Sequence, residues 1–328
     1  MQGALIARAP TRLDLGGGWT DVPPYCDREG GAVCNVAITR YATATVATGG
    51  HVAARGGRAT DAALVRAALA RGPLPAAEAM VTSDFPVGAG LGGSAAAGVA
   101  LAGALAAHAG QPLSPDALAA LSRDTEVKEL GIAGGYQDHY AAAYGGALLL
   151  TFANCVGVER LNVEKRTSDN FVRRGVLLYS GESRISATTI IAVVDAYLSG
   201  DARVSAALAR MKTLAREMAA ALRSGDLDVL GALIGEHWIQ QRALHPSITT
   251  PRIDAIEHAA RGAGALGVTA RGASGGGCVL AFAAEGRDEE LAHALAPLGE
   301  RLTYDLDSIG FDVIASMSGE QSTEEAEA

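Results

Sequence analysis

Aromatic residues are scarce in this chain, where they make up 5% of 328 residues. So few rings argue against the stacking platforms that bind single-stranded nucleic acids. Positive charge is also in deficit, because 27 Lys and Arg stand against 36 Asp and Glu and leave a formal net charge of −9. This balance disfavours nucleic acid or an anionic membrane as partner, but it permits a local basic pocket for a small phosphorylated substrate.

Long hydrophobic runs are missing as well. The longest apolar run, Ala95–Ala107, is shorter than the roughly 20 residues that a membrane-spanning helix needs. Charges at Arg8, Arg12 and Asp14 argue against a signal peptide. The four cysteines form no Cys-x-x-Cys pair, and the seven histidines show no metal-site spacing. We therefore expect a cytoplasmic protein with reduced core thiols and with neither a membrane nor a nucleic-acid partner.

The abundant residues indicate a well-filled core of small side chains, since 49% of the chain is hydrophobic and 41 residues are Gly. The length suggests about two domains. Predicted strands and helices alternate irregularly, which favours an α+β fold with mostly antiparallel sheets. The polar stretch Asn162–Asn170 is the predicted boundary between an N-terminal lobe, residues 1–165, and a C-terminal lobe, residues 170–318. Residues 319–328 are predicted to form an acidic tail.

Apolar spacing, turn residues and helix caps predict the individual elements. Strands are predicted at Ile6–Leu15, Gly31–Thr48 (as strand, turn and strand), Met80–Asp84, Ala147–Phe152, Val176–Tyr179, Val268–Thr269, Val279–Phe282, Leu302–Tyr304 and Phe311–Ala315. Helices are predicted at Thr60–Arg71, from the end of the Gly-rich segment to His108, and at Ser114–Leu130, Ser186–Leu198, Val204–Leu222, Leu227–Gln240, Pro251–Arg261 and Glu289–Leu298.

A Gly-rich segment between a predicted strand and a predicted helix is the most informative motif. Its residues are Gly88, Ala89, Gly90, Leu91, Gly92, Gly93 and Ser94. Glycines let several backbone N–H groups turn toward one point, and the helix N-terminus adds partial positive charge, so the segment suits an anion. The Ser94 hydroxyl suits a phosphate or its Mg²⁺ ion. The alternative is a serine that only caps the helix.

Two better-known phosphate motifs fail here. Gly88-x-Gly90-x-x-Gly93 matches the dinucleotide fingerprint, but that motif needs an acidic residue at the end of a second strand about 20 positions later. The chain has a helix entry there, so an NAD-dependent oxidoreductase is disfavoured. The P-loop needs Gly-Lys-Ser/Thr, and this segment holds no Lys.

Two acidic residues follow the Gly-rich segment. Glu126 lies toward the end of a predicted helix, and Asp138 follows a Gly-rich turn. Beside a phosphate cradle, one carboxylate can hold Mg²⁺ and the other can take or orient the proton of an acceptor hydroxyl. The alternative, favoured if no phosphate cradle is present, is that Glu126 is a solvated helix residue and Asp138 a helix N-cap.

A second Gly-rich turn spans Gly272–Gly277. It spells Gly-x-Ser-x-Gly, the nucleophile elbow of hydrolases. The acid and His that a triad needs would have to be Glu285 or Asp288 and His293, which leaves no room for the remaining strands. A turn that approaches a ligand or another backbone is the better interpretation.

Together these segments resemble the GHMP family of small-molecule kinases. The three motifs, in the family's order, are Arg8–Asp21, Pro86–Ala96 and Gly272–Gly277. The resemblance implies two α+β lobes with ATP and substrate in the cleft between them. It also implies that Asp138 accepts or orients the acceptor proton and that Arg12 lies beside it.

The resemblance implies further roles. Gly88–Ser94 would wrap the ATP phosphates, and Ser94 with Glu126 would bind Mg²⁺. Asp21 would contact a sugar hydroxyl. The other positions that the resemblance assigns to substrate binding are Thr20, Gly135, Arg184 and Gly275.

Within the family, the segments Tyr136–Gly146, Ser180–Ser186 and His245–Arg252 resemble heptose 7-phosphate kinases, whereas Trp19 in the first motif resembles fucokinases. The function implied is phosphorylation of an anomeric hydroxyl, with D-glycero-D-manno-heptose 7-phosphate giving the 1,7-bisphosphate. Fucokinase or another sugar-1-kinase is the alternative, followed by a non-catalytic sugar sensor. A homodimer is a further expectation. A distal phosphate would need a cation, for which Arg28, Arg40 and Arg184 are candidates.

Three departures from the family pattern accompany the resemblance. Gly93-Ser94 stands where many members have two hydroxyl residues, and Ala273-Ser274 stands where glycines are usual. His139 replaces a common Gln after Asp138. None of these changes removes a charged role.

Overall fold

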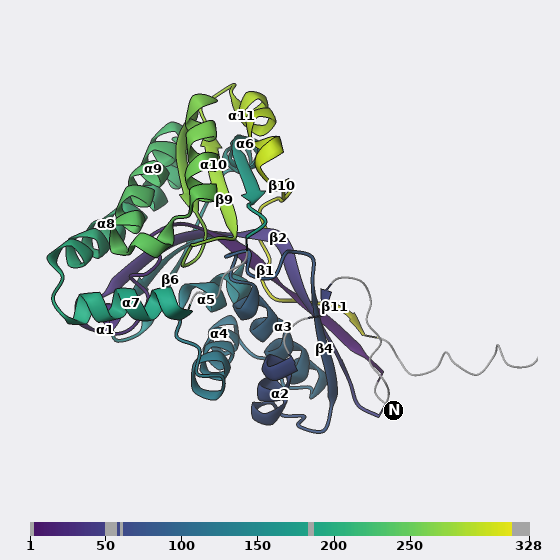
Figure 1. Ribbon diagram of the computed structural model, residues 1–328. Coiled ribbons are helices and arrows are strands. Elements are labelled where there is room, and N and C mark those ends of the chain that lie inside the picture. The colour runs from purple at the N-terminus through teal and green to yellow at the C-terminus, as the bar shows by residue number, and fades with distance from the viewer. Residues whose placement is uncertain (1–2, 50–57, 60–61, 183–186, 317–328) are drawn as a thin grey trace, which may run out of the picture.

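Two antiparallel sheets, each accompanied by helices, organise the chain in a computed structural model that describes residues 3–49, 58–59, 62–182 and 187–316 (Figure 1). The first sheet has seven strands in the order β11-β1-β2-β4-β3, with β5 pairing β2 and β6. Its strands are β1 (Leu5–Gly16), β2 (Gly31–Ala47), β3 (Arg58–Ala59), β4 (Glu78–Ser83), β5 (Ala147–Phe152), β6 (Val156–Leu161) and β11 (Asp312–Ser316). The second sheet, in the order β10-β7-β9-β8, consists of β7 (Gly175–Tyr179), β8 (Ala265–Ala270), β9 (Cys278–Ala283) and β10 (Glu300–Arg301). The predicted α+β class with antiparallel sheets is confirmed.

The helices divide between the two sheets. The first part of the chain supplies α1 (Tyr25–Glu29), α2 (Ala62–Arg71), α3 (Gly93–His108), α4 (Pro115–Asp124), a π-helical turn (Thr125–Glu129) and α5 (Gln137–Tyr144). The second part supplies α6 (Lys165–Arg174), α7 (Ala187–Leu198), α8 (Ala202–Ser224), α9 (Leu227–Leu244), α10 (Pro251–Gly262), α11 (Asp288–Leu295) and the 3-10 turns Pro246–Ile248 and Ala296–Leu298. In Figure 1, α2–α5 lie together below the long strands of the first sheet, and α9–α11 gather around the second sheet.

The long pair β1 and β2 forms the centre of the molecule. Helix α3 packs against both strands, and α8, from the second half of the chain, packs against both as well. One hydrophobic core therefore runs through both halves, from Leu13 and Val36 on these strands to Leu101 on α3 and Leu214 on α8. This shared core fixes the position of the second sheet relative to the first.

Helix α3 is buried on nearly all sides, which explains the apolar run that begins at Ala95. Its small residues permit close contact. A Cβ on Gly98 would lie 2.4 Å from the Ser122 hydroxyl oxygen, and a Cβ on Gly103 would lie 2.1 Å from the ring of Phe311. Among the described residues, no helix is both long and apolar enough to cross a membrane.

Two strand predictions are wrong, and helix α6 was not expected. Gly31–Ala47 is one continuous strand, because no Gly or Pro interrupts it after Gly31, and it pairs β5 with its first half and β4 with its second. The polar stretch at residues 162–170 contains the start of α6, an amphipathic helix that buries Phe171. Leu302–Tyr304 is not a strand, although the Leu302 N–H still bonds to the Leu177 carbonyl.

The division of the chain into lobes at residues 165–170 stays a prediction. Strand β11, placed by that division in the second lobe, pairs with β1 in the first sheet. The tail at residues 319–328 lies outside the described residues. All four cysteines are free, and Cys26, Cys34 and Cys278 are buried as expected, but Cys155 is exposed.

Candidate active site

The Gly88–Ser94 loop connects the end of β4 to α3 and adopts the expected cradle-like backbone. Gly88, Gly90 and Gly92 have positive φ angles of 74°, 74° and 77°, which side chains rarely adopt. The side chains between them, Ala89 and Leu91, are buried and fasten the loop to the core. Helix α3 begins at Gly93, and the first N–H groups of a helix have no intrahelical partner. The loop thus suits an anion at the N-terminus of α3.

The second Gly-rich turn packs directly on this loop. The Cys278 N–H donates to the Ala89 carbonyl at 2.8 Å. A Cβ on Gly90 would lie 2.6 Å from the Arg271 carbonyl oxygen, and one on Gly272 would lie 3.1 Å from the Gly90 Cα. The two motifs, more than 170 positions apart, therefore meet backbone to backbone, which requires glycine at both places.

Arg12 and Asp138 meet at the edge of the same loop. Arg12 on β1 places Nε and one terminal nitrogen 2.8 Å from Asp138 Oδ1, and its other terminal nitrogen donates to the Gly90 carbonyl at 2.7 Å. The Arg12 side chain is 4% exposed, whereas Asp138, in the first turn of α5, is 31% exposed. Asp138 Oδ2 lies beside Gly92, where a Cβ would be 3.2 Å away. The pair predicted from the sequence therefore faces the loop, with its carboxylate open to a ligand.

Ser94 and Glu126 also come together. Glu126 lies in the π-helical turn after α4, and the Ser94 hydroxyl at the start of α3 donates a hydrogen bond to it. Burial on its own would raise the pKa of Glu126, but hydrogen bonds from His139 and Ser94 outweigh burial, so the pKa is lowered. A charged carboxylate next to a hydroxyl is a donor set that fits Mg²⁺, which takes one or two protein oxygens and completes its shell with phosphate and water. Within the described ranges, no cluster of three His, Cys, Asp or Glu side chains suggests a dedicated metal cage.

Asp21 anchors the start of α5. Its Oδ2 accepts the N–H groups of Tyr136 at 2.8 Å and Gln137 at 3.0 Å. Complete burial raises the pKa of Asp21 to about 6, although these two hydrogen bonds oppose the shift. Gly135 lies so close that a Cβ there would be 2.0 Å from Asp21 Oδ2. Asp21 therefore fixes the helix that presents Asp138.

The other predicted substrate residues occupy different surroundings. Thr20 is fully buried, and its hydroxyl bonds to the carbonyls of Gly17 and Ala32, so it holds the first motif to β2. The Gly275 N–H donates to the Ile248 carbonyl at 2.8 Å. Arg184 lies outside the described residues. Contact of these residues with a substrate stays a prediction.

Comparison with known proteins finds family matches in two separate parts of the chain. The model of the GHMP kinases N-terminal domain matches residues 58–146, and that of the GHMP kinases C-terminal domain matches residues 218–299. The chain belongs to the GHMP kinase family. The loop, Glu126 and Asp138 lie within the first match, and the helices that support the second Gly-rich turn lie within the second match.

Similar proteins span most of the chain. The D-glycero-alpha-D-manno-heptose 7-phosphate kinase of Campylobacter jejuni is 27% identical over 313 residues, which are 88% of this chain and 92% of that one. The L-fucokinase/L-fucose-1-P guanylyltransferase of Bacteroides fragilis is 26% identical over 82% of this chain, which spans 33% of that longer protein. The crystal structure of a D-glycero-D-manno-heptose 1-phosphate kinase from Bacteroides thetaiotaomicron superposes with a TM-score of 0.75 and 25% identity, covering 96% of this chain and 100% of that one.

Behind Arg12 and Asp138 of this GHMP kinase lies a buried polar cluster that the sequence did not reveal. Asp14 accepts from the Gln137 amide at 3.1 Å, and its backbone carbonyl accepts from the buried Arg271. His237 on α9 accepts the Gly17 N–H at 3.0 Å, and burial lowers its pKa to about 4, so it is neutral with its proton on Nδ1. The cluster joins the first motif to both halves of the chain. Its members are far apart in sequence, so no local pattern could have indicated it.

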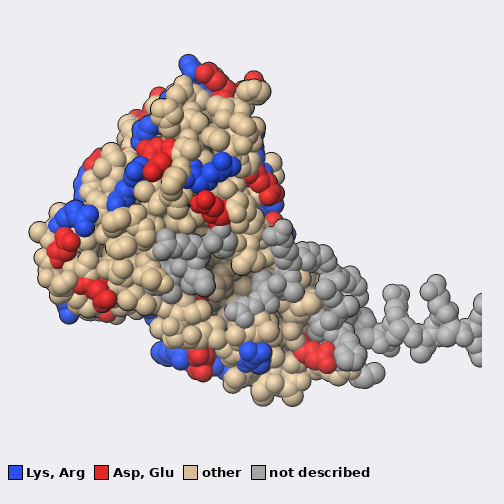
Figure 2. Space-filling view, viewed as in Figure 1, with Lys and Arg blue, Asp and Glu red and all other residues tan. Residues whose placement is uncertain are grey.

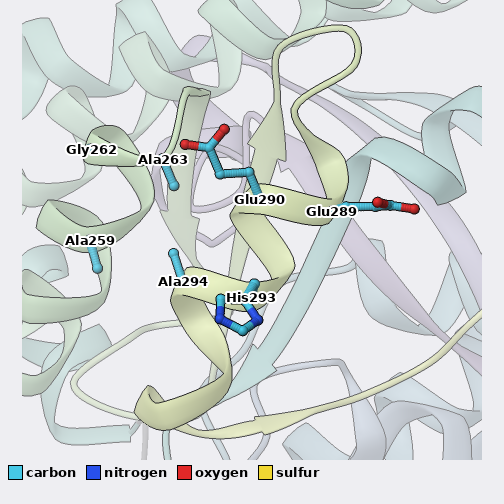
Figure 3. Close-up of a pocket in the computed structure, with 7 residues that line it drawn as sticks. All are labelled: Ala259, Gly262, Ala263, Glu289, Glu290, His293 and Ala294. Atoms are coloured by element: carbon cyan, nitrogen blue, oxygen red, sulfur yellow. The ribbon is translucent and has the colours of Figure 1, made fainter.

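The surface agrees with a site between the two parts of the kinase. In the face shown in Figure 2, the described surface is hollowed between the part formed by the second sheet with its helices and the part formed by α2–α5. A separate surface groove between α10 and α11 is lined by small residues together with Glu289, Glu290 and His293 (Figure 3). The groove contains none of the site residues described above.

The close contact of Gly92 with Asp138 gives a first prediction. Gly92→Ala combines a strained positive φ with a Cβ 3.1 Å from Asp138 Cγ, so it should displace the carboxylate and lower kcat at least about tenfold. The matched control is Gly110→Ala, which has a similar φ of 72° but no heavy atom within 4 Å of the new Cβ. Thermal unfolding should show a similar loss of stability, about 1–2 kcal/mol, in both variants. Equal kcat in both variants would contradict the contact.

Proposed function

We propose that this GHMP kinase transfers the γ-phosphoryl group of ATP to the anomeric hydroxyl of a sugar phosphate, D-glycero-D-manno-heptose 7-phosphate, to give the 1,7-bisphosphate. The observation that carries the proposal is the partly exposed Asp138 carboxylate held by Arg12 at the edge of the Gly88–Ser94 loop. An anion cradle and a carboxylate within reach of one another are what phosphoryl transfer to a hydroxyl requires.

The two oxygens of Asp138 have different surroundings. Both contacts from Arg12 go to Oδ1, while Oδ2 lies next to Gly92 at the loop. Oδ2 is therefore the atom assigned to accept or orient the proton of the sugar hydroxyl. Arg12, which also bonds to the Gly90 carbonyl, places positive charge between the carboxylate and the loop, where negative charge spreads over the transferred phosphoryl group.

Mg²⁺ is the cofactor proposed for the pair formed by Ser94 and Glu126. Their hydroxyl and carboxylate oxygens, next to the N-terminus of α3, fit an ion that also binds phosphate oxygens. When bound, Mg²⁺ neutralises charge on the triphosphate. The protein's own contribution is to hold Ser94 and Glu126 together before the nucleotide arrives.

The heptose phosphate is favoured over fucose because two heptose phosphate kinases are similar over 88% and 96% of this chain, against 82% for the fucokinase part of a bifunctional protein. A distal phosphate needs a cation. Arg40, one of the candidate cations, already donates hydrogen bonds to the Thr303 carbonyl and the Asp84 carbonyl. Arg123, stacked 3.6 Å from the centre of the Tyr136 ring and bonded to the Gly135 carbonyl, presents a guanidinium near Asp21.

A panel of acceptors tests the proposal. ADP release is measured with ATP and Mg²⁺ on D-glycero-D-manno-heptose 7-phosphate, the unphosphorylated heptose, fucose, galactose and mannose. The proposal expects kcat/KM to be at least about 100-fold higher for the 7-phosphate than for each neutral sugar, with the new phosphate on C1 by ³¹P NMR. A preference for fucose would establish the alternative, and sugar binding without ADP release would indicate a sensor.

A further inference from the structure

A chain of hydrogen bonds runs through the proposed metal ligand Glu126. Glu126 Oε2 lies 3.1 Å from His139 Nε2, and His139 Nδ1 lies 2.9 Å from the Ser122 hydroxyl. Ser122 also reaches the Ala95 carbonyl at 3.4 Å, and the Ser94 hydroxyl donates to Glu126. This chain of hydrogen bonds begins and ends on adjacent residues of α3 and passes through α4, α5 and the π-helical turn.

These hydrogen bonds leave one role for the His139 imidazole. Glu126 as a carboxylate only accepts hydrogen bonds, so His139 must carry a proton on Nε2. This holds whether the Ser122 hydroxyl donates to Nδ1 or to the Ala95 carbonyl. His139 is therefore a fixed donor to one oxygen of Glu126. With 2% of its side chain exposed, His139 is packed too tightly to turn away, while Glu126 is 13% exposed.

Helix α5 thereby serves both carboxylates of the site. Neighbouring residues on a helix point about 100° apart, so Asp138 reaches forward to Arg12 while His139 reaches back to Glu126. Asp21 holds the first turn of this helix through the N–H groups of Tyr136 and Gln137. The first turn of α5 therefore fixes the position of Asp138 and, through His139, that of Glu126.

We propose that His139 is a positioning residue that fixes the carboxylate of Glu126 for the Mg²⁺ ion of the nucleotide, an inference that rests on the proposed role of Glu126. A free carboxylate rotates about its last bond, and a ligand held by a second hydrogen bond loses less freedom when the ion binds. Such outer partners typically change metal affinity 10- to 100-fold when they are removed.

The test compares His139→Phe, which keeps a ring but removes the donor, with His139→Gln, whose longer amide can still donate to Glu126. Mn²⁺ serves as the probe, and its free concentration is followed by electron paramagnetic resonance in the presence of a non-hydrolysable ATP analogue. We expect His139→Phe to weaken Mn²⁺ binding at least about tenfold and His139→Gln to restore it to within about threefold. The Mg²⁺ concentration for half-maximal kcat should change in parallel, with the sugar KM unchanged at saturating Mg²⁺.

Two further variants keep the proposal testable if the phenylalanine variant does not fold. His139→Asn keeps the amide but is too short to reach Glu126, so it should behave like the Phe variant. His258→Phe, on the exposed face of α10, repeats the chemical change away from the site and should bind Mn²⁺ as the wild type does. Unchanged Mn²⁺ binding in His139→Asn or His139→Phe, with only a lower melting temperature, would overturn the proposal.

The control Glu126→Gln separates the two levels of inference. If Glu126→Gln and His139→Phe both weaken Mn²⁺ binding, both assignments are supported. If only Glu126→Gln does so, Glu126 is a ligand and the role of His139 fails alone. If neither does so while the wild type still turns over ATP, the metal assignment in the proposed function fails, and the inference about His139 fails with it.

Discussion

Asp138→Asn is expected to lower kcat about 10³-fold while the affinity for ATP changes less than about threefold. Asn cannot take the acceptor proton, and general-base catalysis contributes about 10²–10⁴ to such rates. The Asn carbonyl can still accept both Arg12 contacts, which now go to a single oxygen, Oδ1. The geometry of the loop should therefore persist. Steady-state kinetics with the preferred sugar and binding of a fluorescent ATP analogue measure the two effects separately.

A matched control for this variant exists elsewhere in the chain. Asp228 on α9 also pairs with a nearly buried arginine, Arg174, at 2.5 Å. Asp228→Asn makes the same chemical change and should reproduce any loss of stability without lowering kcat. If Asp138→Asn keeps kcat within about tenfold of the wild type, Asp138 is not the group that handles the proton, and transfer must depend on the cradle and Arg12.

The parts of the site that could be predicted from sequence are those that depend on residues close together along the chain. The glycines at 88, 90 and 92 signal positive φ, and the structure places all three there. These glycines contact the second Gly-rich turn and Arg12 only because the fold brings both β1 and the start of β9 against the loop. Local sequence spacing does not specify that packing. His139 was visible only as a neighbour of Asp138, because its partner Glu126 is 13 positions earlier on another helix.

The fold shows the same limit. Elements with strong periodicity or caps were predicted well; Ser114, for example, caps α4 through the Ala117 N–H as expected. Polar segments were misjudged. Residues 165–174 form an amphipathic helix whose solvent face is polar, and β6 is an edge strand with polar residues on its exposed side, so neither has the apolar density of a core element. The placement of β11 next to β1 depends on a return of the chain across both lobes, which tertiary packing alone decides.

Asp21→Asn is expected to stabilise the protein at pH 7 and to impair the enzyme. The pKa of Asp21 is about 6 in the folded state against an ordinary value of 3.8, because burial penalises the charge. The folded chain thus keeps this proton between about pH 4 and 6 after the unfolded chain has lost it. Stability therefore falls as pH rises through that window, and at pH 7 the buried charge costs about 1–3 kcal/mol. Asn removes the charge, while its carbonyl can still accept from Tyr136 and Gln137.

Urea unfolding of both proteins at pH 4.5 and pH 7 measures this effect. The advantage of Asp21→Asn should be largest at pH 7 and should shrink toward pH 4.5, where the wild-type carboxyl is protonated in the folded state. The proposed contact of Asp21 with a sugar hydroxyl predicts that the sugar KM rises about 100-fold in the variant, since hydrogen bonds to a charged group contribute about 1.5–3 kcal/mol.

Asp307→Asn is the control for the second effect. Asp307 is also buried and also accepts two backbone N–H groups, those of Ile309 and Gly310, but it lies beside Tyr41, outside the proposed site. Its variant should leave the sugar KM unchanged. If Asp21→Asn gains stability at pH 7 but keeps the wild-type KM, Asp21 only anchors α5. If Asp21→Asn instead lowers stability at pH 7, the charged Asp21 carboxylate is stabilised more than its described surroundings indicate. A cation or a bound water must then offset the cost of its burial.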